Sequence, residues 1–274
     1  MNNFKKIGLT ALAGSLIATS AFAGSMSVGG SAGIGYGGSS NYDRGNTWSS
    51  GDSLTFTGSG ELDNGMNVSM SFVLDQDDDT TQSEAKREEN SPFDSHSVTV
   101  SSDSFGSLKF SGEGGSSSTS AIDGTAAGDL WDNFDDETGL EPTGVGSGDN
   151  MMMYTLPSIM DDLSLNVSYL PSGSGTDSAV GYGGTFSGVE GLSVSYATGD
   201  DNTVGNTGDG TVLKASYAYG SFTISASDYE YDTTGTSSDD DVSAYKLSYT
   251  VSDELSVSYG NETVETGTLE AEYE

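Results

Sequence analysis

Apolar and small polar residues alternate with a period of two along most of the chain after residue 24. The segment 162–170 shows the pattern clearly, with apolar Leu163, Leu165, Val167 and Tyr169 alternating with polar Ser164, Asn166 and Ser168. Successive side chains of a strand point to opposite faces. The period therefore predicts β-strands with one apolar and one polar face.

The alternation predicts fourteen strands in a single all-β domain. They are the segments 25–37, 53–62, 66–75, 95–102, 105–112, 150–157, 162–170, 178–187, 190–198, 210–219, 221–231, 241–251, 254–260 and 267–273. Asp63-Asn64-Gly65, between the second and third segments, is typical of a tight hairpin because Asn and Gly accept a positive φ.

The predicted connections alternate between short and long. The long ones are 38–52, 76–94, 113–149, 171–177, 199–209, 232–240 and 261–266. Outer-membrane barrels have short turns on the periplasmic side and long loops outside. The pattern therefore predicts a transmembrane antiparallel β-barrel with both chain ends on the periplasmic side.

The two faces have the residue types that such a barrel requires. Ser, Thr and Gly dominate the polar face, and small polar residues suit a water-filled lumen. Tyrosines in phase with the apolar residues are expected to anchor the barrel at the lipid headgroups. These are Tyr36, Tyr154, Tyr169, Tyr182, Tyr196, Tyr217, Tyr249 and Tyr259. Core tyrosines of a soluble sandwich are the alternative.

Residues 1–23 are typical of a secretory signal peptide. Lys5 and Lys6 precede an apolar stretch at 7–19, and Ala21-Phe22-Ala23 has the small residues of a cleavage site. We therefore expect residues 24–274 to form the exported domain. No later window approaches the roughly 18 to 20 apolar residues of a spanning helix, so membrane insertion is expected as a closed barrel.

Composition agrees with a barrel that is apolar only on its outside. Apolar residues make up 33% of the chain, which nevertheless has 14 Tyr, 10 Phe and 39 Gly. Disorder is the other interpretation of low hydrophobicity and high charge, and the sustained alternation argues against it. The chain has no cysteine, so no disulfide framework is expected.

The chain is strongly acidic, with a formal net charge of −34. Removal of Lys5 and Lys6 with the signal peptide would make it still more negative. Much of the negative charge lies in predicted connections such as Asp77-Asp78-Asp79. Nucleic acids are therefore poor partners, and cations are expected to collect at the extracellular mouth, with screening over about 8 Å at physiological ionic strength. Acidic loops that only keep the surface soluble are the alternative.

Neither an enzyme nor a cofactor or metal site is expected. Asp75, Asp77 and Asp79 have the spacing of an EF-hand loop, but Thr80 and Lys86 replace its Gly and Glu. His96 is the only histidine and has no cysteine to pair with, which argues against nucleophilic dyads and zinc sites.

The chain resembles the general diffusion porins of Gram-negative bacteria, in particular the alphaproteobacterial type. The resemblance rests on the signal peptide, the segment 104–110, the long third loop at 113–149 and its return through 153–157. It implies an outer-membrane homotrimer, in contact with lipid, that passes small hydrophilic solutes and ions by diffusion. It also implies that the third loop folds into the lumen and narrows the pore.

The resemblance assigns two sets of site residues. The acidic side of the constriction would be Asp123, Asp129, Asp132, Asp135, Asp136 and Glu137, for which a solvated surface loop is the simpler interpretation. The basic wall would be Lys109, Lys214 and Lys246, which lie out of phase with their apolar neighbours and should face the lumen. The arginine ladder of the family is absent. With so many carboxylates, the pore is expected to prefer cations.

The end of the chain also departs from the family. Porins of this type have sixteen strands and end on an aromatic residue, whereas this chain stops at Glu274 after the fourteenth predicted strand. A fragment lacking the last hairpin is favoured over a fourteen-stranded barrel. Two other functions stay open: an exported acidic adhesin or surface structural protein, and a substrate-specific channel.

Overall fold

The computed structural model describes residues 24–37, 47–75, 95–122, 124–128, 130, 145–173, 177–203, 206–233, 240–266 and 269–273. They form fourteen strands and one short 3-10 turn. The chain divides into two compact units, residues 1–102 and 103–274, which we call unit 1 and unit 2. In the described ranges, no helix is long and apolar enough to cross a membrane.

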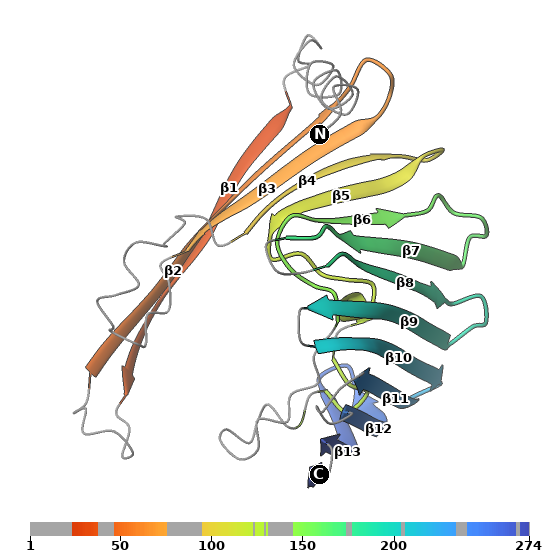
Figure 1. The fold of residues 1–274 in the computed structure, drawn as a ribbon. Helices are drawn as coiled ribbons and strands as arrows, with labels where there is room; N and C mark the ends of the chain where they lie inside the picture. The colour runs from red at the N-terminus through yellow and green to blue at the C-terminus, as the bar shows by residue number, and fades with distance from the viewer. Residues whose placement is uncertain are drawn as a thin grey trace. The chain divides into compact units, whose positions relative to one another are not determined.

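Unit 1 contains four antiparallel strands that pair in chain order (Figure 1). They are β1 (Ser25–Gly37), β2 (Thr47–Glu61), β3 (Asn67–Asp75) and β4 (Ser95–Ser102). The predicted hairpin joins β2 and β3, with Gly65 at a φ of 79°. Its geometry is fixed because the Leu62 N–H donates to the Met66 carbonyl and the Met66 N–H donates to Asn64 Oδ1.

The two faces of unit 1 differ as the alternation predicts. On one face, which we call the hydroxyl face, Ser and Thr side chains pair across β1 and β2. The oxygen pairs are Ser25 and Ser59 at 2.9 Å, Ser27 and Thr57 at 2.6 Å, and Ser31 and Ser53 at 3.0 Å. The opposite, apolar face exposes large side chains, including Met26, Val28, Leu54 and Met70.

Unit 2 contains ten strands, again antiparallel neighbours in chain order (Figure 1). They are β5 (Gly106–Glu113), β6 (Met151–Thr155), β7 (Leu163–Leu170), β8 (Ala179–Phe186), β9 (Leu192–Thr203), β10 (Asn206–Tyr219), β11 (Phe222–Thr233), β12 (Asp240–Ser252), β13 (Leu255–Thr266) and β14 (Leu269–Tyr273). The 3-10 turn η2 (Ser120–Ile122) lies in the connection between β5 and β6.

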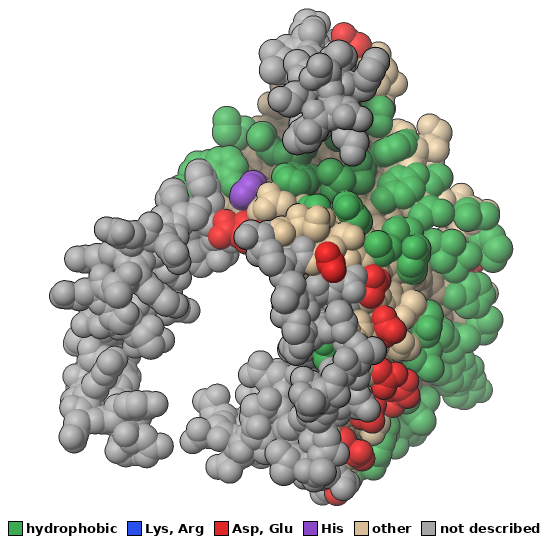
Figure 2. Space-filling model, in the orientation of Figure 1, with side chains coloured by type: hydrophobic (Ala, Val, Ile, Leu, Met, Phe, Trp, Pro, Cys, Tyr) green, Lys and Arg blue, Asp and Glu red, His purple; other side chains and the backbone are tan. Residues whose placement is uncertain are grey.

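We call the face of unit 2 that carries Ser168, Lys214 and Val242 the inner face, and the opposite face the outer face. Hydrophobic side chains cover the outer face (Figure 2). Seven of the tyrosines predicted on the apolar phase lie there: Tyr154, Tyr169, Tyr182, Tyr196, Tyr217, Tyr249 and Tyr259. Exposed apolar area of this extent is typical of a surface covered by lipid or protein.

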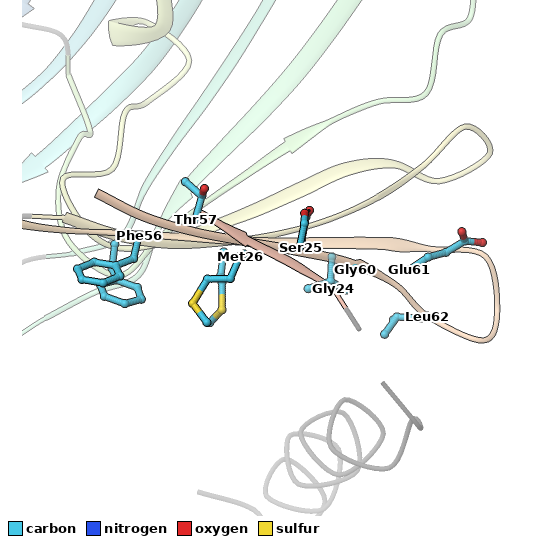
Figure 3. A pocket seen from close by; sticks show the side chains of 13 residues that line it. Gly24, Ser25, Met26, Phe56, Thr57, Gly60, Glu61 and Leu62 are labelled. Atoms are coloured by element: carbon cyan, nitrogen blue, oxygen red, sulfur yellow. The ribbon is translucent and has the colours of Figure 1, made fainter. Parts of the chain in front are cut away.

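The apolar face of unit 1 contains a depression of about 340 Å³. Gly58 lies at its floor, between the side chains of Met26 and Met70 on the neighbouring strands. Phe56 and Phe72 stack beside it with ring centroids 4.8 Å apart. Figure 3 shows Met26 and Phe56 on this side of the sheet and Thr57 on the other.

All fourteen predicted strands are confirmed, but two predicted long connections are wrong, and a third, 38–52, is shortened because β2 already begins at Thr47. Residues 199–209 are mostly strand, because β9 continues to Thr203 and β10 begins at Asn206. Residues 261–266 belong to β13. Apolar alternation ends where the outer face becomes polar, whereas backbone pairing continues beyond that point. The alternation of short and long connections therefore fails at these two hairpins.

Candidate functional site

The described parts of the connection between β5 and β6 lie on the inner face of unit 2. They are residues 114–122, 124–128, 130 and 145–150, which we call the loop. We call residues 114–122 the first arm of the loop and residues 145–150 the returning arm. The two arms are joined where Gly115 and Gly148 exchange backbone hydrogen bonds, both of 3.1 Å. Gly114 N–H also donates to Asp149 Oδ1 at 3.1 Å. These bonds hold residues 114–115 and 148–149 side by side at the point where the loop leaves the sheet.

The first arm of the loop is bonded to β7. The Ser118 N–H donates to Ser168 Oγ at 3.0 Å, and both residues are buried. Thr119 Oγ1 donates to the Val145 carbonyl at 3.2 Å, which links the first arm to the returning one. The arms are therefore tied both to each other and to the sheet.

The tip of the loop, residues 124–128, is bonded to strands β10 to β13. Lys214 Nζ donates to the Gly124 carbonyl at 2.6 Å, and Lys246 Nζ donates to the Ala127 carbonyl at 3.4 Å. Thr125 Oγ1 donates to Glu262 Oε2 at 2.5 Å. The Ala126 N–H donates to Ser227 Oγ at 2.8 Å.

Two clusters of buried apolar side chains fill the space between the loop and the inner face. Val145 of the loop packs in the first cluster, with Val212, Tyr229, Tyr231, Val242 and Val264 of the strands and Ile122 at its edge. Ala126 and Ala127 pack against Ala244 in the second cluster, with Leu130 at its edge. The apolar core of unit 2 therefore lies between a loop and one face of a sheet.

Glycines of the inner face leave the space that the loop occupies. A Cβ added at Gly210 would lie 2.6 Å from a methyl carbon of Val145, which is too close. A Cβ at Gly260 would lie 3.4 Å from Ala127 Cβ, and one at Gly181 would lie 3.3 Å from Ser118 Cβ. Glycine in a strand often marks such a close approach by another segment.

The register places Gly181, Gly199 and Gly210 side by side on β8, β9 and β10. Ser168 on β7 precedes them in the same cross-strand row. This row receives Ser118 and Val145. Four neighbouring positions on β7 to β10 therefore have no side chain larger than serine, which lets Ser118 and Val145 come close to the sheet.

The two predicted sets of site residues have different outcomes. All six carboxylates, Asp123, Asp129, Asp132, Asp135, Asp136 and Glu137, lie outside the described residues. Lys109, Lys214 and Lys246 lie on the inner face, as their phase predicts. Lys214 and Lys246 contact the loop, whereas the side chain of Lys109 is exposed and lies across from Met153.

Sequence reasoning missed Thr125, Ser227 and Glu262. Glu262 was assigned to a connection, but it lies inside β13 with no exposed surface. One available signal was the apolar character of both faces of β12, where Val242 and Ala244 face inward and Tyr245 and Leu247 face outward. A strand that is apolar on both faces must be covered on both.

Further carboxylates lie on the outer face, beyond the apolar part of β9 to β13. Asp209 on β10 lies directly opposite Asp232 on β11. Glu230 on β11, Asp241 on β12 and Glu265 on β13 are likewise direct cross-strand neighbours. Figure 2 shows Asp and Glu side chains along one margin of the apolar face. The acidic surface is therefore not confined to connections. Within the described ranges, no three His, Cys, Asp or Glu side chains form a group that could hold a metal ion.

The chain belongs to the family of Gram-negative porins, which matches residues 8–273. Among solved structures, it is similar to Salmonella typhi OmpF in complex with daunomycin, with 12% identity over 88% of this chain and 78% of the other, and a TM-score of 0.58. Vibrio cholerae OmpT in its trimer form is 14% identical over 91% and 81% of the two chains, with a TM-score of 0.52.

An anion-selective porin from Comamonas acidovorans is similar as well, at 16% identity over 88% and 80% of the two chains, with a TM-score of 0.55. Comparison with curated proteins finds no match. The resemblance inferred from the sequence is thus confirmed, and the fold is an antiparallel β-barrel of the porin type. Membership of this family means an outer-membrane diffusion pore. The ion preference has to come from the residues of this chain, because an anion-selective porin shares the fold.

Proposed function

We propose that the chain forms a passive, cation-selective pore for small hydrophilic solutes and ions, with no chemical step. The observation that supports this most directly is the loop fixed to the inner face by Lys214, Ser227 and Glu262, while the outer face is apolar. A segment bonded to the lumen side of a barrel wall reduces the open cross-section. It therefore limits the size of a diffusing solute.

The proposed preference for cations rests on charge. The chain has 42 Asp and Glu against 8 Lys and Arg. Six of the carboxylates, at 123, 129, 132, 135, 136 and 137, belong to the connection that carries the loop. Two lysines of the inner face donate to loop carbonyls, so their charges lie at the loop and not on an open wall. We propose Lys109 as the remaining basic group of this set that faces solvent.

We further propose that residues 1–23 are a signal peptide and that residues 24–274 form a homotrimer in the outer membrane. The apolar face of unit 1 is the proposed contact between copies. This face exposes Met26, Val28, Leu54 and Met70, and exposed apolar area of this kind is typical of a surface that lipid or another protein covers. The mass of the detergent-solubilised protein tests the assembly.

The proposed function predicts stepwise conductance in a planar lipid bilayer. Refolded residues 24–274 should give stable steps, and the reversal potential under a KCl gradient should have the sign of a cation-selective pore. The preference should weaken as KCl is raised, because salt screens the carboxylates. Stable anion-selective steps would contradict the charge argument. Absence of conductance from folded, inserted protein would contradict the pore itself and favour a structural protein of the cell surface.

Two triple variants separate the carboxylates of the β5–β6 connection from the general negative charge. Asp132→Asn, Asp135→Asn and Asp136→Asn together should lower the cation-to-anion permeability ratio by on the order of twofold, since such fields amount to a few kT. The control neutralises Asp77, Asp78 and Asp79, which removes the same charge from another connection. Equal effects of the two triple variants would show that the carboxylates of the β5–β6 connection have no special role in selectivity.

A further inference from the structure

We propose that Lys214, Lys246 and Glu262 are positioning residues that clamp the tip of the loop and thereby set the width of the pore. This inference rests on the proposed pore function. It gives the two lysines a role different from that of free charges on a lumen wall. The three groups bond the loop at Gly124, Ala127 and Thr125, respectively.

The tip follows one cross-strand row of the inner face. Lys214, Ser227, Ala244 and Glu262 are direct neighbours on β10, β11, β12 and β13. Three of them bond to the tip, and Ala244 packs against its alanines. The four residues 124 to 127 therefore contact β10, β13, β11 and β12, in that order, so the tip lies over all four strands and not along a single one.

Lys246 lies in the next row and holds the following part of the tip. It pairs with Gly260 across β12 and β13, and Ala127 of the loop lies over Gly260. A Cβ at Gly260 would lie 3.4 Å from Ala127 Cβ, which is ordinary contact. Ala127 lies over Gly260 of β13, and the Lys246 ammonium donates to the Ala127 carbonyl from the neighbouring strand β12.

The bond types suit a clamp. A lysine ammonium has three donors and no acceptor, so it can satisfy carbonyls of a tip that has no regular secondary structure. Hydrogen bonds to charged groups stabilise more than neutral ones. Removing a lysine should therefore lower the ratio of seated to displaced tip by about tenfold or more. A displaced tip changes the open area, so it should produce additional conductance levels.

The absence of cysteine from the chain allows a reversible substitute for the clamp. The Cβ separation of 3.4 Å between Ala127 and a residue at 260 is close to the roughly 3.5–4.5 Å that a disulfide needs. Ala127→Cys with Gly260→Cys should therefore form a disulfide between the loop and β13. This disulfide would hold the tip in place whether or not the lysines are present.

The test combines this disulfide with Lys214→Met and Lys246→Met. The protein is refolded oxidised, so that it folds with the tip seated, and single-channel currents are recorded before and after a thiol reductant. We expect one conductance level when oxidised. When reduced, additional levels should appear, and the ratio of time in the native level to time in the other levels should fall by about tenfold or more. The disulfide variant with both lysines should keep one level in either state. Lys214→Arg with Lys246→Arg should also keep one level.

Two outcomes would overturn the clamp. One is a lysine-free protein that keeps a single level after reduction. The other is a change in reversal potential that occurs equally in the oxidised and reduced protein, with no new level, which would make the lysines free wall charges. Both outcomes still require a conducting protein. Absence of conductance from the unsubstituted chain would instead contradict the proposed function.

Discussion

The hydroxyl face of β1 to β4 and the inner face of β7 to β13 come from the same alternating pattern but have different residues. On β1 and β2, Ser and Thr hydroxyls hydrogen-bond to each other in pairs such as Ser27 and Thr57. On β8 to β13, the corresponding positions are often Gly, Ala, Val or Tyr, as at Gly210, Ala244 and Val242. The first face satisfies its polar groups within the sheet, whereas the second is shaped to receive a loop.

The difference teaches that an inner wall is not uniformly polar. Where water is the neighbour, small hydroxyls pair across strands and keep the surface wettable. Where the loop is the neighbour, the wall needs glycine for space, apolar groups for packing and a few charged groups for fixing. One alternating sequence therefore encodes two kinds of wall, and the contrast between them can be tested by substitutions matched across the two regions.

The largest expected effect comes from placing a charge on the lipid side of β9. Val194 lies on the outer face, in a cross-strand row with Phe186 and Ala215. Val194→Arg should destabilise the barrel by about 2–4 kcal/mol if the site is near the middle of the bilayer, because arginine there is costly. The measurement is the yield of folded protein in lipid vesicles.

Ser193→Arg, one residue earlier and on the inner face, is the control and should insert normally. Equal insertion would reverse the assignment of the two faces.

The next prediction compares one glycine in each wall. Gly210→Leu forces a side chain into the space of Val145, so we expect a loss of stability at the upper end of the about 1–3 kcal/mol typical of overpacking. Gly29 lies on the hydroxyl face, and a Cβ there meets nothing within 4 Å. Gly29→Leu should therefore cost much less. Urea unfolding in lipid vesicles measures both, and similar losses would mean that Gly210 does not seat the loop.

The sequence predicts the strands well because a barrel repeats one physical requirement many times. Each strand must alternate so that one face meets lipid and the other meets water, and this requirement is local. It ends at the edge of the hydrocarbon, so the polar ends of β9, β10 and β13 were assigned to connections. The phase of Lys214 and Lys246 was predicted correctly for the same local reason.

The contacts of the loop tip could not be predicted in this way. Thr125 and Glu262 are 137 residues apart, and nothing local to either indicates the other. Their contact depends on the register of several strands and on the path of the loop. Glu262 lies in the predicted connection 261–266, two residues beyond the predicted end of the strand, whereas β13 continues to Thr266. In the structure it is buried against the loop.

The smallest predicted effect compares one hydroxyl in each region. Thr125→Val keeps the shape of the side chain but removes the hydroxyl that donates to Glu262, a residue with no exposed surface. The loss should be on the order of 1–2 kcal/mol, because a buried carboxylate loses a hydrogen-bond donor. Thr57→Val removes an exposed hydroxyl that pairs with Ser27, so its effect should stay within about 0.5 kcal/mol. Thermal unfolding of the two variants in the same lipid measures the difference in stability. A loss of stability at Thr125 no larger than that at Thr57 would show that the bond between Thr125 and Glu262 does not hold the tip, and the clamp would then depend on Lys214 and Lys246 alone.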